Sequence, residues 1–322
     1  MKNIQVETTP EKITGMRLIR LLFMMSRPSQ LALIVFVYLV GGLIAWSSGA
    51  AFDSQIFWFG LFVLILVSMS IHYANEYADV ETDSLTTRSP FSGGSGALPN
   101  SGVDPRLALA AAWVALGLGA AAAFVGWVVG LLSLAAVGVL GFGVFFGWSY
   151  SLEPLAPGWR GWGELDNAII GGIALPLYGF VVQAGRIEGW VILSCIPFAA
   201  AVFINLLATT WPDRAADAAV GKRTLATRWT PARLRLSYWL AVFGMFLSIM
   251  LLYGRVLPAV VVWSSFLTVP LILWGGLAYT RQHSAFPTVA AMLVMLAVQI
   301  LAWWSETDYC CLLFSTPSIL GG

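Results

Sequence analysis

The chain has 322 residues, of which 59% are hydrophobic and only 10% are charged. Soluble globular domains carry about 25% charged residues, so the polar surface that soluble domains of this length need is missing. The formal net charge of +1 gives no indication of a nucleic-acid partner. The three cysteines, Cys195, Cys310 and Cys311, form neither an even disulfide framework nor a metal-binding spacing. The composition therefore indicates an integral membrane protein.

Residues 1–28 are polar and contain five lysines or arginines, which is typical of a cytoplasmic segment before a first membrane span rather than of a secretory signal. A helical span needs about 20 apolar residues. Such stretches follow at 31–50, 56–74, 107–152, 168–185, 189–211, 236–254, 256–280 and 284–305. The third suits two crossings with a turn near 126–130, so we predict nine transmembrane helices, because open loops and sheets cannot satisfy their backbone in lipid. The predicted organisation is an N-terminal segment 1–28, a nine-helix domain 29–305 and a short tail 306–322.

Lysine and arginine residues are divided unevenly between the two sides of this arrangement. The N-terminal segment and the loops on its side hold 15 of the 17 basic residues, and the opposite loops hold Arg186 and Arg255. Basic residues accumulate on the cytoplasmic side of membrane proteins. We therefore predict a multi-pass cell-membrane protein with a cytoplasmic N-terminus and an external C-terminus.

Acidic motifs follow the second and the sixth predicted helices. Positions four apart share one face of a helix, so Asn75, Asp79 and Asp83 form a strip of oxygen ligands. After the sixth helix, Asp213 and Asp217 lie one turn apart. An even number of helices separates the motifs, so both are expected on the same face of the membrane, which the charge distribution predicts to be cytoplasmic.

Opposed carboxylate strips suit diphosphate chemistry that depends on Mg²⁺. This ion binds a few carboxylates together with waters and phosphate oxygens, and it neutralises the charge on a leaving diphosphate. A solvated helix face is the more ordinary explanation of one such motif. Here, however, the chain has only 16 acidic residues, and ionisable groups at membrane depth are costly and tend to be functional. The basic residues predicted to complete the diphosphate site are Arg88, Lys222 and Arg223.

At this point the chain resembles the UbiA superfamily of intramembrane prenyltransferases, over about residues 20–305. The resemblance rests on both motifs in their helices, on Arg27-Pro28 before the first span, and on the stretches 88–98 and 221–228. It implies an all-α integral membrane fold with nine transmembrane helices around a central cavity, and a polyprenyl diphosphate as donor. The implied metal ligands for Mg²⁺ are Asn75, Asp79, Asp83, Asp213 and Asp217, and the four aspartates are implied to be catalytic.

One stretch is most similar to the 1,4-dihydroxy-2-naphthoate prenyltransferases of menaquinone biosynthesis. It contains Tyr150 with Pro154 shortly after it, a Gly-Trp-Gly-Glu sequence that ends at Glu164, and Gln183-Ala-Gly185. The 4-hydroxybenzoate branch more often has a lysine shortly after the tyrosine. This resemblance implies an aromatic acceptor, 1,4-dihydroxy-2-naphthoate or a related quinone precursor, whose carboxyl group leaves as CO₂.

The second motif departs from that branch at two positions. Thr209 stands where the branch usually has an asparagine, and Asn205 lies one turn earlier on roughly the same face. Pro212 directly precedes Asp213, and a proline is well tolerated at the first position of a helix. The sixth helix is therefore expected to break there and to restart in the loop.

Further polar residues near the predicted site have more than one interpretation. Tyr150 is a candidate catalytic residue that stabilises a carbocation, or an interfacial aromatic anchor. His72 suits a general base or a hydrogen-bonded core residue. With Asn205, it is a candidate on the acceptor side. Glu164 and Asp166 are expected in the fourth loop, near the acceptor. The glycine-rich loop 93–96 is predicted to cap the metal site.

The predicted reaction is ionisation of an allylic diphosphate, followed by attack of an electron-rich aromatic ring on the cation. A UbiA-type terpene cyclase would share the first step and need no acceptor. Other acceptors also stay open: 4-hydroxybenzoate, a chlorophyllide, a glyceryl phosphate lipid or a carotenoid. A cation-coupled transporter is a distant alternative, because its acidic groups should lie near the bilayer midplane, whereas these lie at helix ends.

Overall fold

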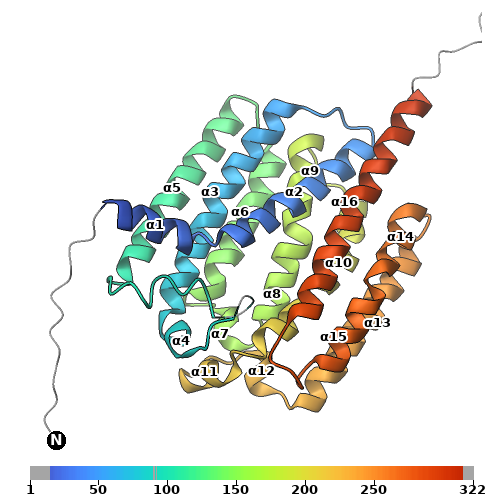
Figure 1. Cartoon of the computed structure of the whole chain (residues 1–322). Helices are drawn as coiled ribbons and strands as arrows, with labels where there is room; N and C mark the ends of the chain where they lie inside the picture. Colours follow the sequence, from blue (N-terminus) through green and yellow to red (C-terminus); the bar gives the residue numbers. More distant parts are fainter. Residues whose placement is uncertain (1–14, 90, 92, 315–322) are drawn as a thin grey trace, which may run out of the picture.

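The computed structural model of the protein describes residues 15–89, 91 and 93–314, and the side chains within these ranges up to residue 307. This part of the chain is helical, without a β-strand (Figure 1). Nine of its helices, some interrupted, are long and apolar enough to span a membrane, as predicted. In chain order they are α2 (Pro28–Ser47), α3 (Ser54–Ala78), α5 (Arg106–Val128), α6 (Leu134–Ser151), α8–α9 (Gly163–Ala184), α10 (Gly189–Thr210), α13 (Pro231–Leu252), α14–α15 (Ala259–Ala278) and α16 (Phe286–Phe314).

Two of the spans change their helical geometry midway. The fifth consists of α8 (Gly163–Ile169), a π-helical segment at Ile170–Ala174 and α9 (Leu175–Ala184). The eighth consists of α14 (Ala259–Ser265), a 3₁₀ turn at Phe266–Thr268 and α15 (Val269–Ala278). Because the fifth span begins at Gly163, our prediction of Glu164 and Asp166 in a loop was wrong. The apolar stretch at 168–185 begins after both acids, yet the span starts before them and they lie in its first turn, where acidic side chains favour a helix.

Helices α2 and α9 pack closely because glycines face each other across their contact. A Cβ atom at Gly41 would overlap the Pro176 carbonyl oxygen, and one at Gly179 would overlap the Tyr38 carbonyl oxygen. Small residues let membrane helices approach in this way. The Tyr38 hydroxyl donates to the Phe57 carbonyl oxygen at 2.9 Å and so ties α3 to the same pair. These contacts hold α3, the helix from which the first acidic motif emerges, against α2 and α9.

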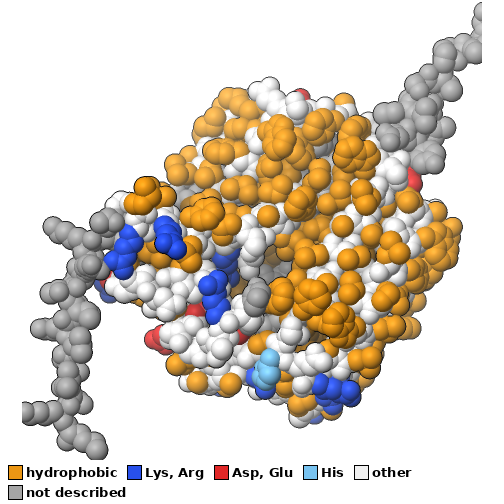
Figure 2. All heavy atoms as spheres, in the orientation of Figure 1, with side chains coloured by type: hydrophobic (Ala, Val, Ile, Leu, Met, Phe, Trp, Pro, Cys, Tyr) orange, Lys and Arg blue, Asp and Glu red, His pale blue; other side chains and the backbone are white. Residues whose placement is uncertain are grey.

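The short helices gather at one end of the bundle, at the bottom of Figure 1. They are α4 (Val80–Leu85), α7 (Pro157–Arg160), α11 (Arg214–Ala219) and α12 (Leu225–Arg228). A further short helix, α1 (Gly15–Met25), precedes the first span and was not predicted; it buries Leu21 and Met25. Figure 2 shows hydrophobic side chains spread over the long helices, whereas charged side chains gather near α1 and the end with the short helices. That end carries the polar chemistry, and its cytoplasmic position stays a prediction.

Candidate functional site

The first acidic motif continues α3 into α4 with little interruption. The Asp79 amide donates to the Asn75 carbonyl oxygen at 2.9 Å, and the Asp83 amide donates to the Asp79 carbonyl oxygen at 2.8 Å. The Asn75 side-chain amide donates to Asp79 Oδ2 at 2.8 Å and to Ser151 Oγ at 2.9 Å. Asn75 and Asp79 therefore share one face, as their spacing of four residues predicts.

The second motif lies on a separate helix. Helix α10 ends at Thr210, and α11 begins at Arg214, with Asp213 at its N-terminal cap. The break includes Pro212, which has no amide hydrogen to continue the helix, so the expected restart is confirmed. The Asp217 amide donates to the Asp213 carbonyl oxygen at 2.9 Å, which places both acids on one turn.

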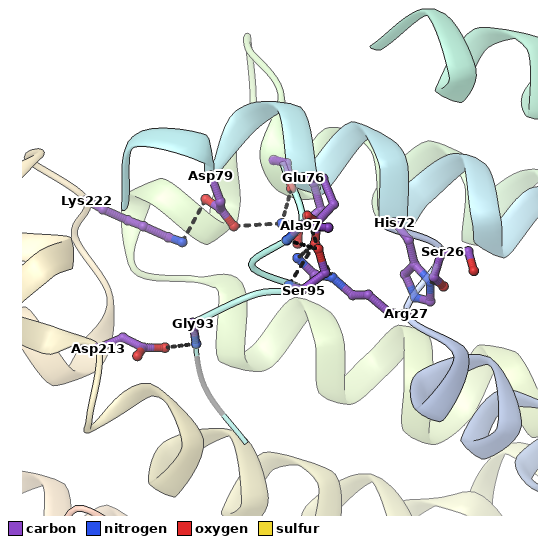
Figure 3. Close-up of polar contacts among 12 residues, drawn as sticks. Ser26, Arg27, His72, Glu76, Asp79, Gly93, Ser95, Ala97, Asp213 and Lys222 are labelled. Atoms are coloured by element: carbon purple, nitrogen blue, oxygen red, sulfur yellow. Dashed lines mark hydrogen bonds and ion pairs between the residues drawn. The ribbon is translucent and has the colours of Figure 1, made fainter. Parts of the chain in front are cut away.

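Lys222 joins the two motifs. Its Nζ lies 2.8 Å from Asp79 Oδ1 (Figure 3). The same atom lies 3.9 Å from Asp217 Oδ1. The side chains of Lys222 and Asp79 are each 11% exposed, and that of Asp217 is 4% exposed. Burial alone would lower the pKa of Lys222, but the neighbouring Asp79, Tyr150 and Asp217 groups raise this pKa above its usual range. A buried positive charge thus already lies between the two acidic motifs.

Asp83, the last acid of the first motif, lies against Gly94 of the neighbouring loop. Its Oδ2 atom is buried and has no hydrogen-bond partner among the described residues. Gly94 has a φ of +58°, and a Cβ atom there would overlap this oxygen. Burial raises the pKa of Asp83 to about 7, although the Arg27 guanidinium opposes the rise. Burial likewise raises the pKa of Asp217 to about 7, against the effect of Lys222. A cation placed beside these carboxyl groups would favour their ionised form.

The loop 93–97, called the cap loop below, is held over the motifs from two sides (Figure 3). The Gly93 amide donates to Asp213 Oδ2 at 3.4 Å. On the other side, Ser95 donates to Glu76 from its amide at 3.1 Å and from its hydroxyl at 2.6 Å. Glu76 is fully buried at its side chain and also pairs with Arg27 at 2.7 Å. Glu76 thus connects the residue before α2, the end of α3 and the cap loop.

The other predicted residues surround this centre at different depths. His72 Nδ1 lies 2.7 Å from the Ser26 carbonyl oxygen, which ties the ring to the entrance of α2. Tyr150, at the end of α6, packs against Gly158 and Gly163. Glu164 is buried and accepts a hydrogen bond from the Leu225 amide at 3.0 Å.

Three further predicted residues lie outside the described contacts of the acidic motifs. Asn205 belongs to α10, and its Oδ1 is buried without a hydrogen-bond partner among the described residues. Arg88 is exposed, and its side chain runs past Gly96 of the cap loop. Arg223 is also exposed; its amide donates to the Trp159 carbonyl oxygen at 3.0 Å. Arg88 therefore lies beside the cap loop, and Arg223 lies beside Trp159.

Comparison with known sequences identifies the family to which this site belongs. The model of the UbiA prenyltransferase family matches residues 34–304, which include both acidic motifs, the cap loop and Lys222. The chain belongs to this family. It is therefore a multi-pass membrane prenyltransferase.

Individual relatives agree with that assignment. The 1,4-dihydroxy-2-naphthoate octaprenyltransferase of Bacillus subtilis (strain 168) is 28% identical over 226 residues, 68% of each chain. A solved structure of digeranylgeranylglyceryl phosphate synthase covers 91% of this chain and 99% of its own with a TM-score of 0.65 at 13% identity. A UbiA homologue from Archaeoglobus fulgidus, bound to GPP and Mg²⁺, covers 89% and 99% with a TM-score of 0.63 at 15% identity. The structural likenesses show the shared fold.

The donor set of this prenyltransferase fits Mg²⁺, which prefers carboxylate, amide and phosphate oxygens. The buried, unpartnered Asp83 Oδ2 is an oxygen of the required kind. In the described part of the chain, however, no group of three or more acidic, histidine or cysteine side chains is already arranged to hold a metal ion. Lys222 draws Asp79 and Asp217 together instead. The site therefore offers candidate metal ligands from two helices rather than a preformed coordination site.

Glu76 is the site residue that the sequence did not reveal. Glu76 directly follows Asn75 in the chain, but its partners lie in other segments. The one available signal was Arg27 directly before the first span, because a basic side chain at that depth needs a buried partner. The prenyltransferase uses this acid to fix its loop rather than as part of the acidic strip.

Proposed function

We propose that this prenyltransferase transfers an isoprenyl chain from a polyprenyl diphosphate to an aromatic acceptor, 1,4-dihydroxy-2-naphthoate or a related quinone precursor. The contact of Lys222 with both Asp79 and Asp217 carries the proposal, because it brings the two acidic motifs to one buried point. The resemblance to the Bacillus subtilis naphthoate enzyme supports the choice of acceptor.

The diphosphate half of the reaction rests on the polar groups around this point. Mg²⁺, when bound, supplies Lewis-acid neutralisation of the leaving diphosphate. Its proposed ligands are Asn75, Asp79, Asp83, Asp213 and Asp217. Lys222 adds a fixed positive charge for a diphosphate oxygen. Arg88 and Arg223 stay proposed as further diphosphate contacts.

Transfer then proceeds by an exchange of bonds at the first carbon of the chain. The bond from this carbon to the diphosphate oxygen breaks, and its electron pair leaves with the diphosphate. A ring carbon of the acceptor supplies the pair for the new carbon–carbon bond. In the naphthoate reaction, the bond between the ring and the carboxylate then breaks, CO₂ leaves, and the electron pair of that bond restores the aromatic ring; an acceptor without a carboxylate loses a ring proton instead. The cap loop is hydrogen-bonded to Asp213 of the second motif and to Glu76 beside the first, a position that suits the exclusion of water from a carbocation.

A product assay tests both diphosphate activation and the choice of acceptor. Purified protein in a bilayer disc is incubated with Mg²⁺, prenyl diphosphates of several lengths and either 1,4-dihydroxy-2-naphthoate or 4-hydroxybenzoate. We expect masses of the prenylated naphthalenediol, with 4-hydroxybenzoate inert. Hydrocarbons or alcohols formed at the same rate from prenyl diphosphate alone would indicate a cyclase. Products with 4-hydroxybenzoate alone would overturn the acceptor while leaving diphosphate activation in place.

We also propose that the site opens to the cytoplasm. Fifteen of the 17 basic residues support this side of the membrane. Ser84, exposed at the end of α4, provides a probe position. Ser84→Cys, with Cys310 and Cys311 replaced by serine, should react with a membrane-impermeant maleimide in inside-out vesicles and not in intact cells. Labelling in intact cells would place the site outside.

A further inference from the structure

Helix α1 precedes the bundle of spans and crosses α3 and α5 rather than running along them (Figure 1). It ends at Met25, and Ser26 and Arg27 connect it to the first span, which begins at Pro28. A connection of this length reaches about 10 Å at most. The C-terminal end of α1 is therefore held at the boundary of the membrane, close to Glu76 beside the first acidic motif, with which Arg27 is paired.

Two stripes of side chains on α1 face away from the protein. Met16, Ile19 and Phe23 recur three and four residues apart, which is the spacing of one helix face, and each is more than half exposed. Arg17 and Arg20 form the second stripe beside them, and both are exposed. Figure 2 shows basic side chains next to hydrophobic ones near α1. An apolar stripe beside a basic stripe is typical of a helix that lies in the membrane interface.

The charge of α1 indicates which kind of lipid it binds. The helix contains two arginines and no acidic residue. Arg20 has no ion-pair partner in the described part of the chain, so its guanidinium group is available to a lipid phosphate through parallel N–H donors. A basic residue at a membrane surface favours anionic over neutral lipid about fivefold. Phospholipids with a net negative charge are therefore the partners that fit this face.

The third face of α1 supports the cap loop. Leu21 and Met25 are buried in one hydrophobic cluster with Ala97, the last residue of this loop. The Arg17 guanidinium group donates to the Ser101 carbonyl oxygen at 2.9 Å, so the segment directly after the loop is held as well. Displacement of α1 would remove both contacts.

A second connection to the cap loop runs through the residue before α2. Arg27 pairs with Glu76, and Glu76 accepts two hydrogen bonds from Ser95 of the loop. At its other end the loop has the longer hydrogen bond from the Gly93 amide to Asp213, at 3.4 Å. The position of the cap loop therefore depends more on α1 and the start of α2 than on the second acidic motif.

We propose that α1 is a lipid-binding helix that holds the cap loop in place. Its apolar stripe inserts between the lipid chains of the leaflet, Arg17 and Arg20 bind the headgroups of anionic phospholipids, and the buried face keeps its contacts with the loop. A ligand stabilises the conformation that binds it more tightly. Anionic lipid therefore favours the state in which α1 is docked and the cap loop is closed over both motifs. This role does not depend on which prenyl diphosphate or acceptor the enzyme uses.

Amide hydrogen exchange tests the coupling between lipid and loop. The full-length protein is placed in bilayer discs of phosphatidylcholine, with or without phosphatidylglycerol, and exchange in the cap loop is followed by mass spectrometry. The Gly93 and Ser95 amides are hydrogen-bonded, so their exchange reports how often the loop opens. We expect at least about fivefold slower exchange with phosphatidylglycerol. Equal exchange in the two kinds of disc would overturn the proposal.

Variants with reversed charge assign this effect to α1. Arg20→Glu should remove the dependence on phosphatidylglycerol, because its side chain repels the headgroups, and its Tm in detergent should equal that of the wild type. Arg233→Glu is the matched control, since it makes the same change of charge at an exposed position on α13 and should keep the dependence. If both variants keep the dependence, or both lose it, the assignment to α1 is wrong. Hydrogen exchange requires no turnover, so a failure of the proposed reaction leaves this assignment unaffected.

A fluorescent probe on the apolar stripe tests the insertion of α1 directly. Ile19→Cys carries an environment-sensitive fluorophore, with Cys310 and Cys311 replaced by serine and Cys195 buried. Phosphatidylglycerol brominated on its chains should quench the probe more strongly than phosphatidylcholine brominated in the same way, and Arg20→Glu should make the two equal. Equal quenching without that substitution would overturn the selection of anionic lipid. Absence of quenching, or cross-linking of Ile19→Cys to a second copy of the chain, would overturn the insertion of α1 into the bilayer.

Discussion

The two acidic motifs face each other across Lys222 but are supported in different ways. The first extends a membrane span, and its neighbourhood is tied to other segments by Asn75–Ser151 and by Glu76 with Arg27 and Ser95. The second follows the break at Pro212 and sits on the six-residue helix α11. One half of the site is therefore fixed to the membrane bundle, and the other is carried by a loop. This difference suits a site in which one motif sets the position and the other adjusts to the diphosphate.

The largest expected effect comes from removing a carboxylate from either motif. Asp79→Ala and Asp213→Ala should each reduce kcat by about 10³ or more, because metal charge neutralisation supplies several kcal/mol to such steps. Product formation from radiolabelled prenyl diphosphate measures this. Glu81→Ala, an exposed acid on α4, is the matched control and should keep wild-type turnover. Near-normal activity of the Asp79 or Asp213 variant would refute the metal assignment for that motif.

Glu76→Ala should have the next largest effect, confined to the fixed half of the site. It leaves Arg27, which is 15% exposed at its side chain, without its carboxylate partner. Breaking a buried ion pair costs about 3–5 kcal/mol, so we expect a lower Tm and a kcat/KM reduced about 100-fold through loss of the cap loop. Thermal unfolding in detergent and steady-state kinetics measure the two effects.

Arg27→Ala and Ser95→Ala separate the two roles of Glu76. The first should reproduce the loss of Tm. The second removes a donor to Glu76 and leaves the ion pair in place, so activity should fall with a smaller change in Tm. If Ser95→Ala has no effect on activity, the cap loop does not depend on this contact.

Gly94→Ala should have a smaller effect, because a loop can shift where a span cannot. The added methyl group would overlap Asp83 Oδ2, and the φ of +58° is unfavourable for alanine. We expect the Mg²⁺ concentration for half-maximal activity to rise about tenfold, equivalent to about 1.4 kcal/mol. Gly102→Ala has a similar backbone strain, with a φ of +69°, but no atom near the added group. It should leave the Mg²⁺ dependence unchanged, and a shared shift would point to loop strain alone.

Much of the fold could be predicted from the sequence, because each span needs a long apolar stretch and the chain has few charges elsewhere. The spacing of Asn75 and Asp79 correctly predicted that they share one helix face, since helical periodicity is local. Contacts between residues far apart in the chain could not be predicted from the sequence in the same way. Arg27 pairs with Glu76 over 49 positions and Lys222 with Asp79 over 143, and no periodicity reports such pairs. The start of the fifth span was misjudged because Glu164 is buried by a hydrogen bond to a loop amide, a contact that only the fold creates.

Pro212→Ala tests the adjustable half of the site and should have the smallest effect. An alanine restores the amide that a continuous helix needs, so α10 is expected to extend toward α11 and to hold Asp213 more rigidly. If the second motif must move during the reaction, kcat should fall a few-fold, and the KM for the prenyl diphosphate should stay the same or decrease. This pattern is expected when a conformational step, rather than substrate binding, limits the rate. Stopped-flow measurement of diphosphate release separates these steps.

Pro231→Ala, at the start of α13 and remote from a break, is the control. Unchanged kinetics of diphosphate release in Pro212→Ala would mean that the second motif is as rigid as the first. The two motifs would then differ only in the residues that anchor them, not in their mobility.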